Sequence, residues 1–286
     1  MFEKVNLFFR NSLQQGLGEQ EFSVAYALIT GGSSGIGREY ARELAAKGWN
    51  LIIVSNRKED NVRVAEELSR QYGIKAEPLY ADLTEADAAE KIYDHVHRLG
   101  AAVEVLINNA GMLLFSQLVN TPAPQLERII ALHCTTPTKL CQLFARDMAA
   151  RGRGHILIMS SITAWTPYPT ISHYAATKAY LHSFAQSLWY EMRDKGVSVT
   201  TVYPSAVDTP FYDLDDKMRR LLLRCGVMLS AECVARKALR AMFRGRRRCL
   251  PGFLTKVEAA ICWLLPAWAL LPILKIPAVK RILERI

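Results

Sequence analysis

Tyr174 and Lys178, four residues apart, are the side chains in this sequence best suited to acid–base chemistry. Residues with this spacing lie one turn apart on the same face of a helix. A free phenol has a pKa of about 10 and is a poor base at neutral pH, but a nearby positive charge favours its ionised form. Tyr174 can then exchange a proton with a substrate oxygen. The plain alternative is an exposed aromatic beside a solvated lysine.

A glycine-rich segment, TGGSSGIG at residues 30–37, lies between an apolar stretch and a helical one. Glycines permit a tight turn and let the backbone approach a ligand closely, and the following helix offers unpaired N–H groups to a pyrophosphate. The segment predicts a dinucleotide site with these residues: Gly31, Ser33, Ser34, Gly35, Ile36 and Gly37. A glycine turn without a ligand is the alternative, which the strands and helices on both sides disfavour.

The residues after the second apolar stretch indicate which nucleotide binds. An acidic residue there would bind a ribose 2′-hydroxyl and repel a 2′-phosphate. This chain has Ser55, Asn56, Arg57 and Lys58, with no acid at that point. Hydroxyl and amide groups donate hydrogen bonds and basic side chains pair with phosphate, so NADP(H) is favoured. The alternative is that Arg57 and Lys58 are solvated charges beside a helix.

The elements that must position these groups alternate along the chain. Apolar stretches typical of buried strands lie at 25–30, 50–55, 76–83, 103–111, 154–161 and 197–204. Helical stretches lie between them at 38–48, 61–73, 87–100, 125–150 and 173–196. This alternation predicts a parallel sheet covered by helices on both faces, a doubly wound, Rossmann-type α/β fold. We expect an N-terminal extension (1–24), one domain (25–249) and a hydrophobic C-terminal tail (250–286).

Composition indicates the setting in which the protein works. Half of the 286 residues are hydrophobic and 22% are charged, which is typical of a globular chain. The six cysteines form no CxxC pair and show no zinc-ligand spacing, so we expect reduced thiols and no metal. The N-terminus has no signal-peptide pattern. These features predict a cytoplasmic protein.

The net charge of +9 is concentrated near the C-terminus. Residues 236–286 hold twelve Lys or Arg and two Glu, a net of +10, so the preceding residues sum to −1. Within them, residues 259–274 carry no charge, but they are shorter than the roughly 20 residues of a bilayer span and are interrupted by prolines. The basic flanks predict peripheral contact with a membrane surface. Contact with a second subunit or with the body of the protein is the alternative.

Several motifs together give the chain a family resemblance. Asp82-Leu83 lies at the end of the third predicted strand, Asn108-Asn109-Ala110-Gly111 lies at the end of the fourth, and Tyr174 and Lys178 form Tyr-x-x-x-Lys. With TGGSSGIG, these motifs resemble the classical short-chain dehydrogenases/reductases from about residue 25 to about residue 245. The tail resembles that of bacterial-type members with a hydrophobic, basic C-terminus. The resemblance implies an NAD(P)-dependent oxidoreductase.

The resemblance also implies which residues border the cofactor. Asp82 and Leu83 would contact the adenine. The nicotinamide and its ribose would be bordered by Asn109, Ala110 and Gly111. The segment PSAVDTP at 204–210 resembles the stretch that binds the nicotinamide amide, with these candidates: Pro204, Val207 and Thr209. Ser205 stands where the family has a glycine.

In the family pattern, a serine orients the substrate carbonyl, and Ser161, thirteen residues before Tyr174, has that position. Ser160 offers a second hydroxyl, but the spacing selects Ser161. Lys178 would also bind the nicotinamide ribose. The family asparagine that holds a water near this lysine is replaced by His133, 28 residues before Ser161. We expect a working proton relay in which the imidazole holds or replaces that water; a structural core histidine or an impaired relay is the alternative.

The expected substrate is lipophilic. Residues 211–229, which form a substrate lid in the family, are rich in Leu, Met and Val, and residues 112–115 are also apolar. We expect reduction of a ketone such as a 3-keto-sphingoid base, a 3-oxoacyl chain or a steroid-like ketone, by a homo-oligomer that binds no nucleic acid. A non-catalytic nucleotide-sensing or lipid-binding protein on the same scaffold is the alternative.

Overall fold

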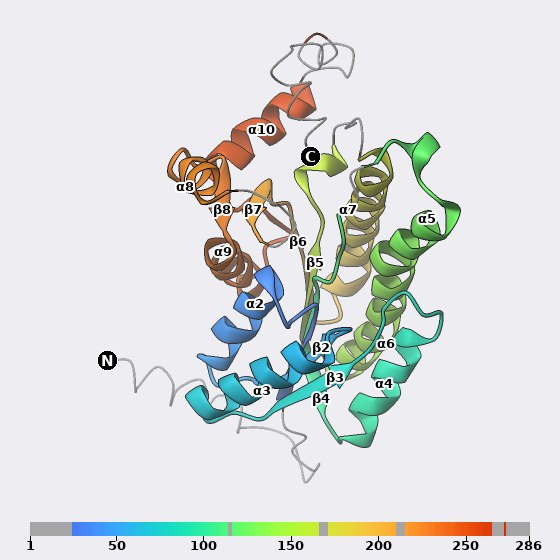
Figure 1. The fold of residues 1–286 in the computed structure, drawn as a ribbon. Coiled ribbons are helices and arrows are strands. Elements are labelled where there is room, and N and C mark those ends of the chain that lie inside the picture. The colour runs from blue at the N-terminus through green and yellow to red at the C-terminus, as the bar shows by residue number, and fades with distance from the viewer. Residues whose placement is uncertain (1–24, 114–115, 166–170, 210–214, 265–271, 273–286) are drawn as a thin grey trace.

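The computed structural model describes residues 25–113, 116–165, 171–209, 215–264 and 272. Its main sheet has seven strands in the order β3-β2-β1-β4-β5-β6-β9, and every pair is parallel (Figure 1). The strands are β1 (Ala25–Thr30), β2 (Asn50–Ser55), β3 (Ala76–Tyr80), β4 (Ala102–Asn108), β5 (Gly154–Met159), β6 (Val197–Val202) and β9 (Arg248–Cys249). A second, two-stranded sheet pairs β7 (Ala206–Asp208) with β8 (Met228–Ser230).

Helices cover both faces of the main sheet (Figure 1). One face carries α2 (Gly35–Ala45), α3 (Lys58–Tyr72) and α9 (Ala231–Phe243). The other carries α4 (Ala88–Arg98), α6 (Thr136–Arg151) and α7 (Ser172–Arg193), with α5 (Ala123–Ile130) beside α7. Two more helices, α8 (Asp216–Arg224) and α10 (Phe253–Leu264), lie beyond the carboxyl ends of the strands (Figure 1).

The apolar strands explain this layering. Successive side chains of a strand point to opposite faces, so an entirely apolar strand supplies two cores. Ile29 and Ile53 pack under α2, α3 and α9, whereas Leu28 and Ile52 pack under α4, α6 and α7. All four are fully buried. The predicted doubly wound fold is confirmed.

The fold also brings two turns together at one end of the sheet, those that follow β1 and β4, and we call the region between them the crevice. Strands β1 and β4 are neighbours, and the chain leaves them toward helices on opposite faces. In open parallel sheets, ligands bind beyond the carboxyl ends of the strands at this kind of switch point. The glycine-rich turn after β1 and the Asn109–Gly111 loop after β4 therefore lie at the expected ligand position.

The predicted helix over 125–150 is interrupted. The chain forms α5, then a π-helical turn over Ala131–Thr135, then α6. Pro137, in the first turn of α6, has no N–H to donate to the carbonyl of residue 133, so the regular α-helical pattern cannot run through this point. The π turn carries His133 at its middle and holds the imidazole against α7.

Candidate active site

The turn after β1 is packed too closely to accept side chains at Gly31 and Gly37. Gly31 has a φ of +67°, and its N–H donates to the Val54 carbonyl at 2.8 Å. A Cβ on Gly37 would lie 2.1 Å from the Gly31 carbonyl oxygen and 2.6 Å from Nδ2 of Asn109. The glycines therefore let α2 begin directly against both the turn and the loop after β4.

The beginning of α2 suits an anion. Ser34 caps the helix in an extended conformation, its side chain makes no capping hydrogen bond, and the first turn holds no acidic residue. The unpaired N–H groups and the positive end of the helix dipole favour a phosphate at this position. The absence of a side chain at Gly31 and Gly37 keeps the backbone within reach. These residues fit the pyrophosphate of a dinucleotide.

Ser55, at the end of β2, organises the adjoining turn. Its hydroxyl lies 2.7 Å from the Ser33 hydroxyl and accepts a hydrogen bond from the Arg57 N–H at 3.1 Å. Both serines are buried, whereas Asn56 and Arg57 are exposed. Ser55 therefore joins the glycine turn to β2 and leaves Asn56 and Arg57 at the surface, where they can meet a phosphate.

Thr30, which was not among the predicted site residues, joins the two sides of the crevice. Its Oγ1 accepts hydrogen bonds from the N–H groups of Asn109 at 2.9 Å and Ala110 at 3.0 Å, and it donates to the Ile107 carbonyl at 3.2 Å. The Asn109 amide in turn donates to the Thr30 carbonyl at 2.9 Å. The sequence feature that could have identified Thr30 is a hydroxyl side chain at the end of a buried strand, because a buried hydroxyl needs hydrogen-bond partners.

The Asp82-Leu83 turn is fixed by its neighbours. Oδ1 of Asp82 accepts from the N–H and the hydroxyl of Thr84 at 2.9 and 2.8 Å. Burial favours the neutral carboxyl, but these bonds and the Arg128 guanidinium, 3.7 Å away, leave the pKa of Asp82 lower than usual. The carbonyl of buried Leu83 accepts from the Thr136 hydroxyl at 2.8 Å. The turn is thus tied to α6 beside the crevice.

Tyr174 and Lys178 lie one turn apart on α7, as predicted. Nζ of Lys178 is 5.4 Å from the centre of the Tyr174 ring and donates to the Met159 carbonyl at 2.9 Å. The lysine is 5% exposed. Burial lowers its pKa to about 8, and the nearby Cys134 thiol offsets this only in part. At neutral pH the ammonium is therefore still charged, close to the phenol.

The two neighbouring serines after β5 have different hydrogen-bond partners. The Ser160 hydroxyl donates to the Lys178 carbonyl at 2.8 Å and so holds α7 against the sheet. The Ser161 oxygen accepts from the Thr163 N–H at 3.2 Å, which leaves its hydroxyl hydrogen to donate elsewhere. Of the two hydroxyls, the one selected by spacing, Ser161, is suited to a substrate oxygen.

His133 is buried and bonded on both sides. Its Nε2 accepts from the Met112 N–H at 3.0 Å, and its Nδ1 lies 2.8 Å from the Thr177 hydroxyl, which donates to the Tyr174 carbonyl at 2.7 Å. Because an amide N–H can only donate, Nε2 carries no proton and Nδ1–H is the donor to Thr177. Burial first, and then the charges of Lys178 and His173, lower the pKa of His133 well below 6.5. The ring is a neutral, single tautomer.

These bonds bear on the expected proton relay. Both ring nitrogens of His133 are used within the protein, so neither is left to hold a water. The ring instead ties the loop after β4, through Met112, to α7, through Thr177. Its centre is 5.7 Å from that of the Tyr174 ring. The geometry favours a positioning role over direct proton transfer.

The segment after β6 completes the crevice. The Pro204 carbonyl accepts from the Ile162 N–H at 3.2 Å, which joins the segment to the Ser161 turn. A Cβ on Gly35 would lie 3.4 Å from Cγ2 of Thr209, so Thr209 lies beside the glycine-rich turn. Val207 is buried. The predicted nicotinamide segment therefore runs between the two halves of the site.

The first helix of the C-terminal tail, α10, is packed against the domain. Thr255 of α10 is 1% exposed, and its hydroxyl donates to the Ser205 hydroxyl at 3.3 Å. Ser205, which stands where the family has a glycine, thereby gains a partner from the tail. The domain boundary at 249 stays a prediction.

The predicted substrate region is described only in part. Met112 and Leu113 are half-buried beyond β4, while residues 114–115 and 211–214 lie outside the described residues. The expected N-terminal extension and residues 265–271 and 273–286 of the tail also lie outside them. No helix in the described part of the chain is both long and apolar enough to cross a membrane.

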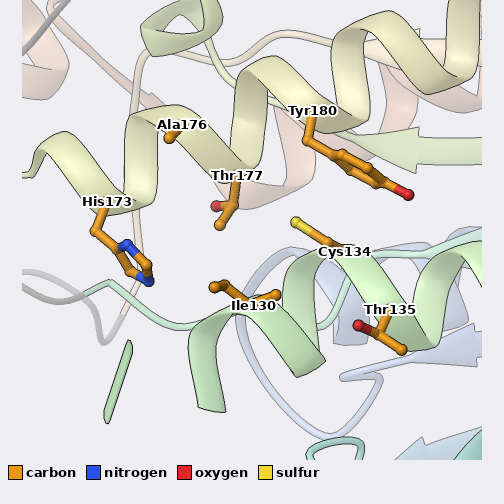
Figure 2. A pocket seen from close by; sticks show the side chains of 7 residues that line it. All are labelled: Ile130, Cys134, Thr135, His173, Ala176, Thr177 and Tyr180. Carbon is orange, nitrogen blue, oxygen red and sulfur yellow. The ribbon is translucent and has the colours of Figure 1, made fainter. Parts of the chain in front are cut away.

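A groove of about 380 Å³ lies between α7 and the segment formed by the end of α5 and the π-helical turn (Figure 2). Figure 2 shows Cys134 and Ile130 on one wall and His173 and Tyr180 on the other. Ser161, Tyr174 and Lys178 do not line it. Thr177 lines the groove and also holds the His133 ring, so one side chain separates the groove from the buried imidazole.

Comparison with known proteins agrees with this geometry. The short chain dehydrogenase family matches residues 25–219. A 17-beta-hydroxysteroid dehydrogenase type 3 from Mus musculus is 35% identical over 200 residues, 68% of this chain and 64% of that protein. A very-long-chain 3-oxoacyl-CoA reductase from Anas platyrhynchos is 33% identical over 206 residues, 70% of this chain and 63% of that protein. The chain thus spans just under two thirds of each relative's length.

One solved structure resembles the chain over nearly its whole length. A short-chain dehydrogenase from Sphingobium yanoikuyae, solved in complex with NADPH, is 28% identical, with a TM-score of 0.74. The similarity covers 92% of this chain and 96% of that one.

Proposed function

The chain belongs to the short-chain dehydrogenase family, and we propose that it is an NADP(H)-dependent reductase of a lipophilic ketone. The observation that carries the proposal is the arrangement of Ser161, Tyr174 and Lys178 beside the crevice, with the ammonium 5.4 Å from the phenol ring. The names of two relatives, a hydroxysteroid dehydrogenase and a 3-oxoacyl-CoA reductase, support a ketone or alcohol on a lipid-like molecule as the reacting group.

In this proposal Tyr174 is the general acid for reduction. When bound, NADPH supplies the hydride for the carbonyl carbon. Ser161 donates a hydrogen bond to the carbonyl oxygen and orients it, and Tyr174 protonates that oxygen as negative charge develops. The Lys178 ammonium stabilises the phenolate that Tyr174 leaves behind. In the reverse direction the phenolate accepts the proton from an alcohol.

His133 is proposed as a positioning residue. It joins Met112, next to the loop expected to border the nicotinamide, to Thr177, which is bonded to the Tyr174 carbonyl. A rigid link between these two elements fixes the distance between the cofactor loop and the acid. Angstrom-scale misplacement of reacting groups costs rate steeply.

Two features support NADP(H) over NAD(H). Asn56 and Arg57 are exposed at the end of β2, beside the glycine-rich turn, and neither is acidic. Arg57 can pair with a 2′-phosphate through charge-assisted hydrogen bonds. The NADPH complex of the similar Sphingobium enzyme agrees with this preference.

The test is a spectrophotometric assay of NADPH oxidation with three ketones: a steroid ketone, a 3-oxoacyl-CoA and a 3-keto-sphingoid base. We expect turnover with at least one of them, a lower kcat/KM with NADH in place of NADPH, and a kcat lower by about 10² to 10⁴-fold in Tyr174→Phe. Tight NADPH binding without turnover on any of these ketones would instead support the non-catalytic, nucleotide-sensing alternative. The homo-oligomer stays a prediction, which light scattering of the purified chain will test.

A further inference from the structure

Helix α10 exposes several apolar side chains to solvent, and a side chain that it buries against the protein is polar. Thr255 faces inward and is 1% exposed, bonded to Ser205. Phe253, Val257 and Ile261 follow one another at a spacing of four and are 78%, 41% and 45% exposed. This is the reverse of a helix that packs on a core, whose apolar stripe faces inward.

Helix α8 repeats this exposure next to α10. It has no buried residue, and Met218 and Leu221 are 44% and 53% exposed. A Cβ on Gly226, just beyond α8, would lie 3.7 Å from Cδ1 of Leu254 on α10, so the two helices adjoin at this point. Figure 1 shows both helices together beyond the carboxyl ends of the strands.

We propose that this surface docks on an anionic lipid bilayer. We define the α8–α10 surface by its exposed apolar residues: Met218, Leu221, Phe253, Leu254, Val257 and Ile261. Exposed apolar area of this kind, larger than isolated surface residues provide, marks an interaction site. Amphipathic helices that lie in the membrane interface combine such residues with a basic flank.

Charge identifies the partner as anionic. Lys217, Arg220 and Arg224 are exposed on α8 beside its apolar residues, and Lys256 is exposed on α10. When Arg219, Asp216 and Glu258 are also counted, α8 and α10 together carry a net charge of +3. Each basic residue near an anionic membrane surface adds about 1 kcal/mol of attraction. An apolar protein partner would leave these charges without a counterpart.

The same surface lies close to the candidate active site. Through Thr255, α10 is bonded to Ser205 in the expected nicotinamide segment, and α10 also contacts the short helix over Ile162–Ala164 that follows Ser161. A protein docked through α8 and α10 therefore turns this end of the crevice toward the bilayer. A lipophilic substrate can then reach the site from the membrane.

The experiment is flotation of the purified full-length protein with vesicles of phosphatidylcholine alone or of phosphatidylcholine with phosphatidylserine, without cofactor or substrate. We expect binding to the anionic vesicles, weaker binding at high salt, and about a tenfold loss of affinity in Val257→Glu. The matched control is Val62→Glu on α3, at the opposite end of the molecule in Figure 1. Val62 is 38% exposed and Val257 41%, and both changes alter the net charge equally.

The outcomes separate the lipid proposal from other partners. Equal vesicle binding by the two variants, or no binding by the parent protein, would overturn it. If the parent protein does not bind vesicles, and light scattering shows that Val257→Glu dissociates an oligomer, the α8–α10 surface is a contact between copies of this chain. Thermal unfolding of both variants verifies that they fold. Because no turnover is measured, a negative result leaves the proposed reaction standing.

Discussion

The two sides of the crevice are built in opposite ways. On the glycine side, the turn after β1 leaves no room for a side chain at Gly31 or Gly37, and a Cβ at Gly37 would come within 2.1 Å of a backbone oxygen. On the α7 side, hydrogen bonds from side chains hold the elements together. His133 accepts from the Met112 N–H, Thr177 donates to the Tyr174 carbonyl, and Lys178 donates to the Met159 carbonyl. One side presents backbone N–H groups, and the other presents a phenol, an ammonium and a hydroxyl.

This difference follows from what each side must recognise. A pyrophosphate is the same in every dinucleotide and is bound well by backbone amides and a helix dipole. A proton transfer needs one group with a suitable pKa at one place. Changes on the glycine side should therefore alter the dissociation constant of the cofactor, and changes on the α7 side should alter kcat.

The largest effect is expected from Tyr174→Phe. This change removes the proposed proton donor and keeps the ring, so kcat should fall by about 10² to 10⁴-fold. The dissociation constant of NADPH, measured by fluorescence titration, should change little. Turnover close to that of the parent would show that another group supplies the proton.

A smaller effect, on binding, is expected from Gly37→Ala. The added methyl group forces the beginning of α2 away from the Gly31 carbonyl, at a cost of about 1 to 3 kcal/mol. The affinity for NADPH should fall by roughly tenfold to a hundredfold.

The control for this change is Gly48→Ala. Gly48 has a φ of +81°, but a Cβ there meets nothing within 4 Å. This variant should lose stability through backbone strain alone, by about 1 kcal/mol, with its NADPH affinity intact. If the two variants bind NADPH equally well, close packing at Gly37 is not what shapes the phosphate site.

His133 tests whether the two sides are independent, because its ring links them. His133→Ala leaves the Met112 N–H without its partner, a loss of about 1 to 3 kcal/mol, and should lower kcat about tenfold and shift its pH profile. His133→Asn should restore kcat, because an amide oxygen can accept from Met112 and an amide N–H can donate to Thr177. Stopped-flow measurement of the hydride step separates this effect from product release. Parent-like rates in both variants would mean that the histidine is only a core residue.

The sequence predicted the fold and the spacing of its motifs better than the contacts between distant segments. The doubly wound fold, the glycine-rich turn and the Tyr174–Lys178 pair were predicted, because each depends on a period or spacing along the chain. The π turn at His133 was not, because it follows from one missing N–H at Pro137. The strand β9 was missed because two residues carry no periodicity.

Contacts between segments far apart in the chain could also not be predicted from the sequence. Thr30 bonds to Asn109 and Ala110, and Thr255 bonds to Ser205, across separations that no local pattern encodes. Spacing selected Ser161 over Ser160, and the bond from the Ser160 hydroxyl to the Lys178 carbonyl, which the sequence does not show, supports that choice.

The smallest effect concerns stability and pH. The pKa of His133 is held well below 6.5 by burial and by Lys178 and His173, whereas in the unfolded chain it returns to about 6.5. Below pH 6.5 the unfolded state therefore binds a proton at this residue that the folded state does not, so stability falls as the pH falls. His133 contributes at most about 1.4 kcal/mol per pH unit to this loss.

Urea unfolding at pH 7 to about 5 measures this contribution as the difference between the parent and His133→Asn. The difference in the free energy of unfolding should be constant above pH 6.5 and should change below it, with the parent losing more stability. In NMR spectra, the imidazole resonance that disappears in the variant should not move over this range in the folded parent. A resonance that titrates near pH 6.5 would mean that the ring is protonated in the folded state, which the bond from the Met112 N–H to Nε2 does not allow. That result would mean that Nε2 of His133 does not accept the hydrogen bond from Met112, and so that the ring does not join the loop after β4 to α7.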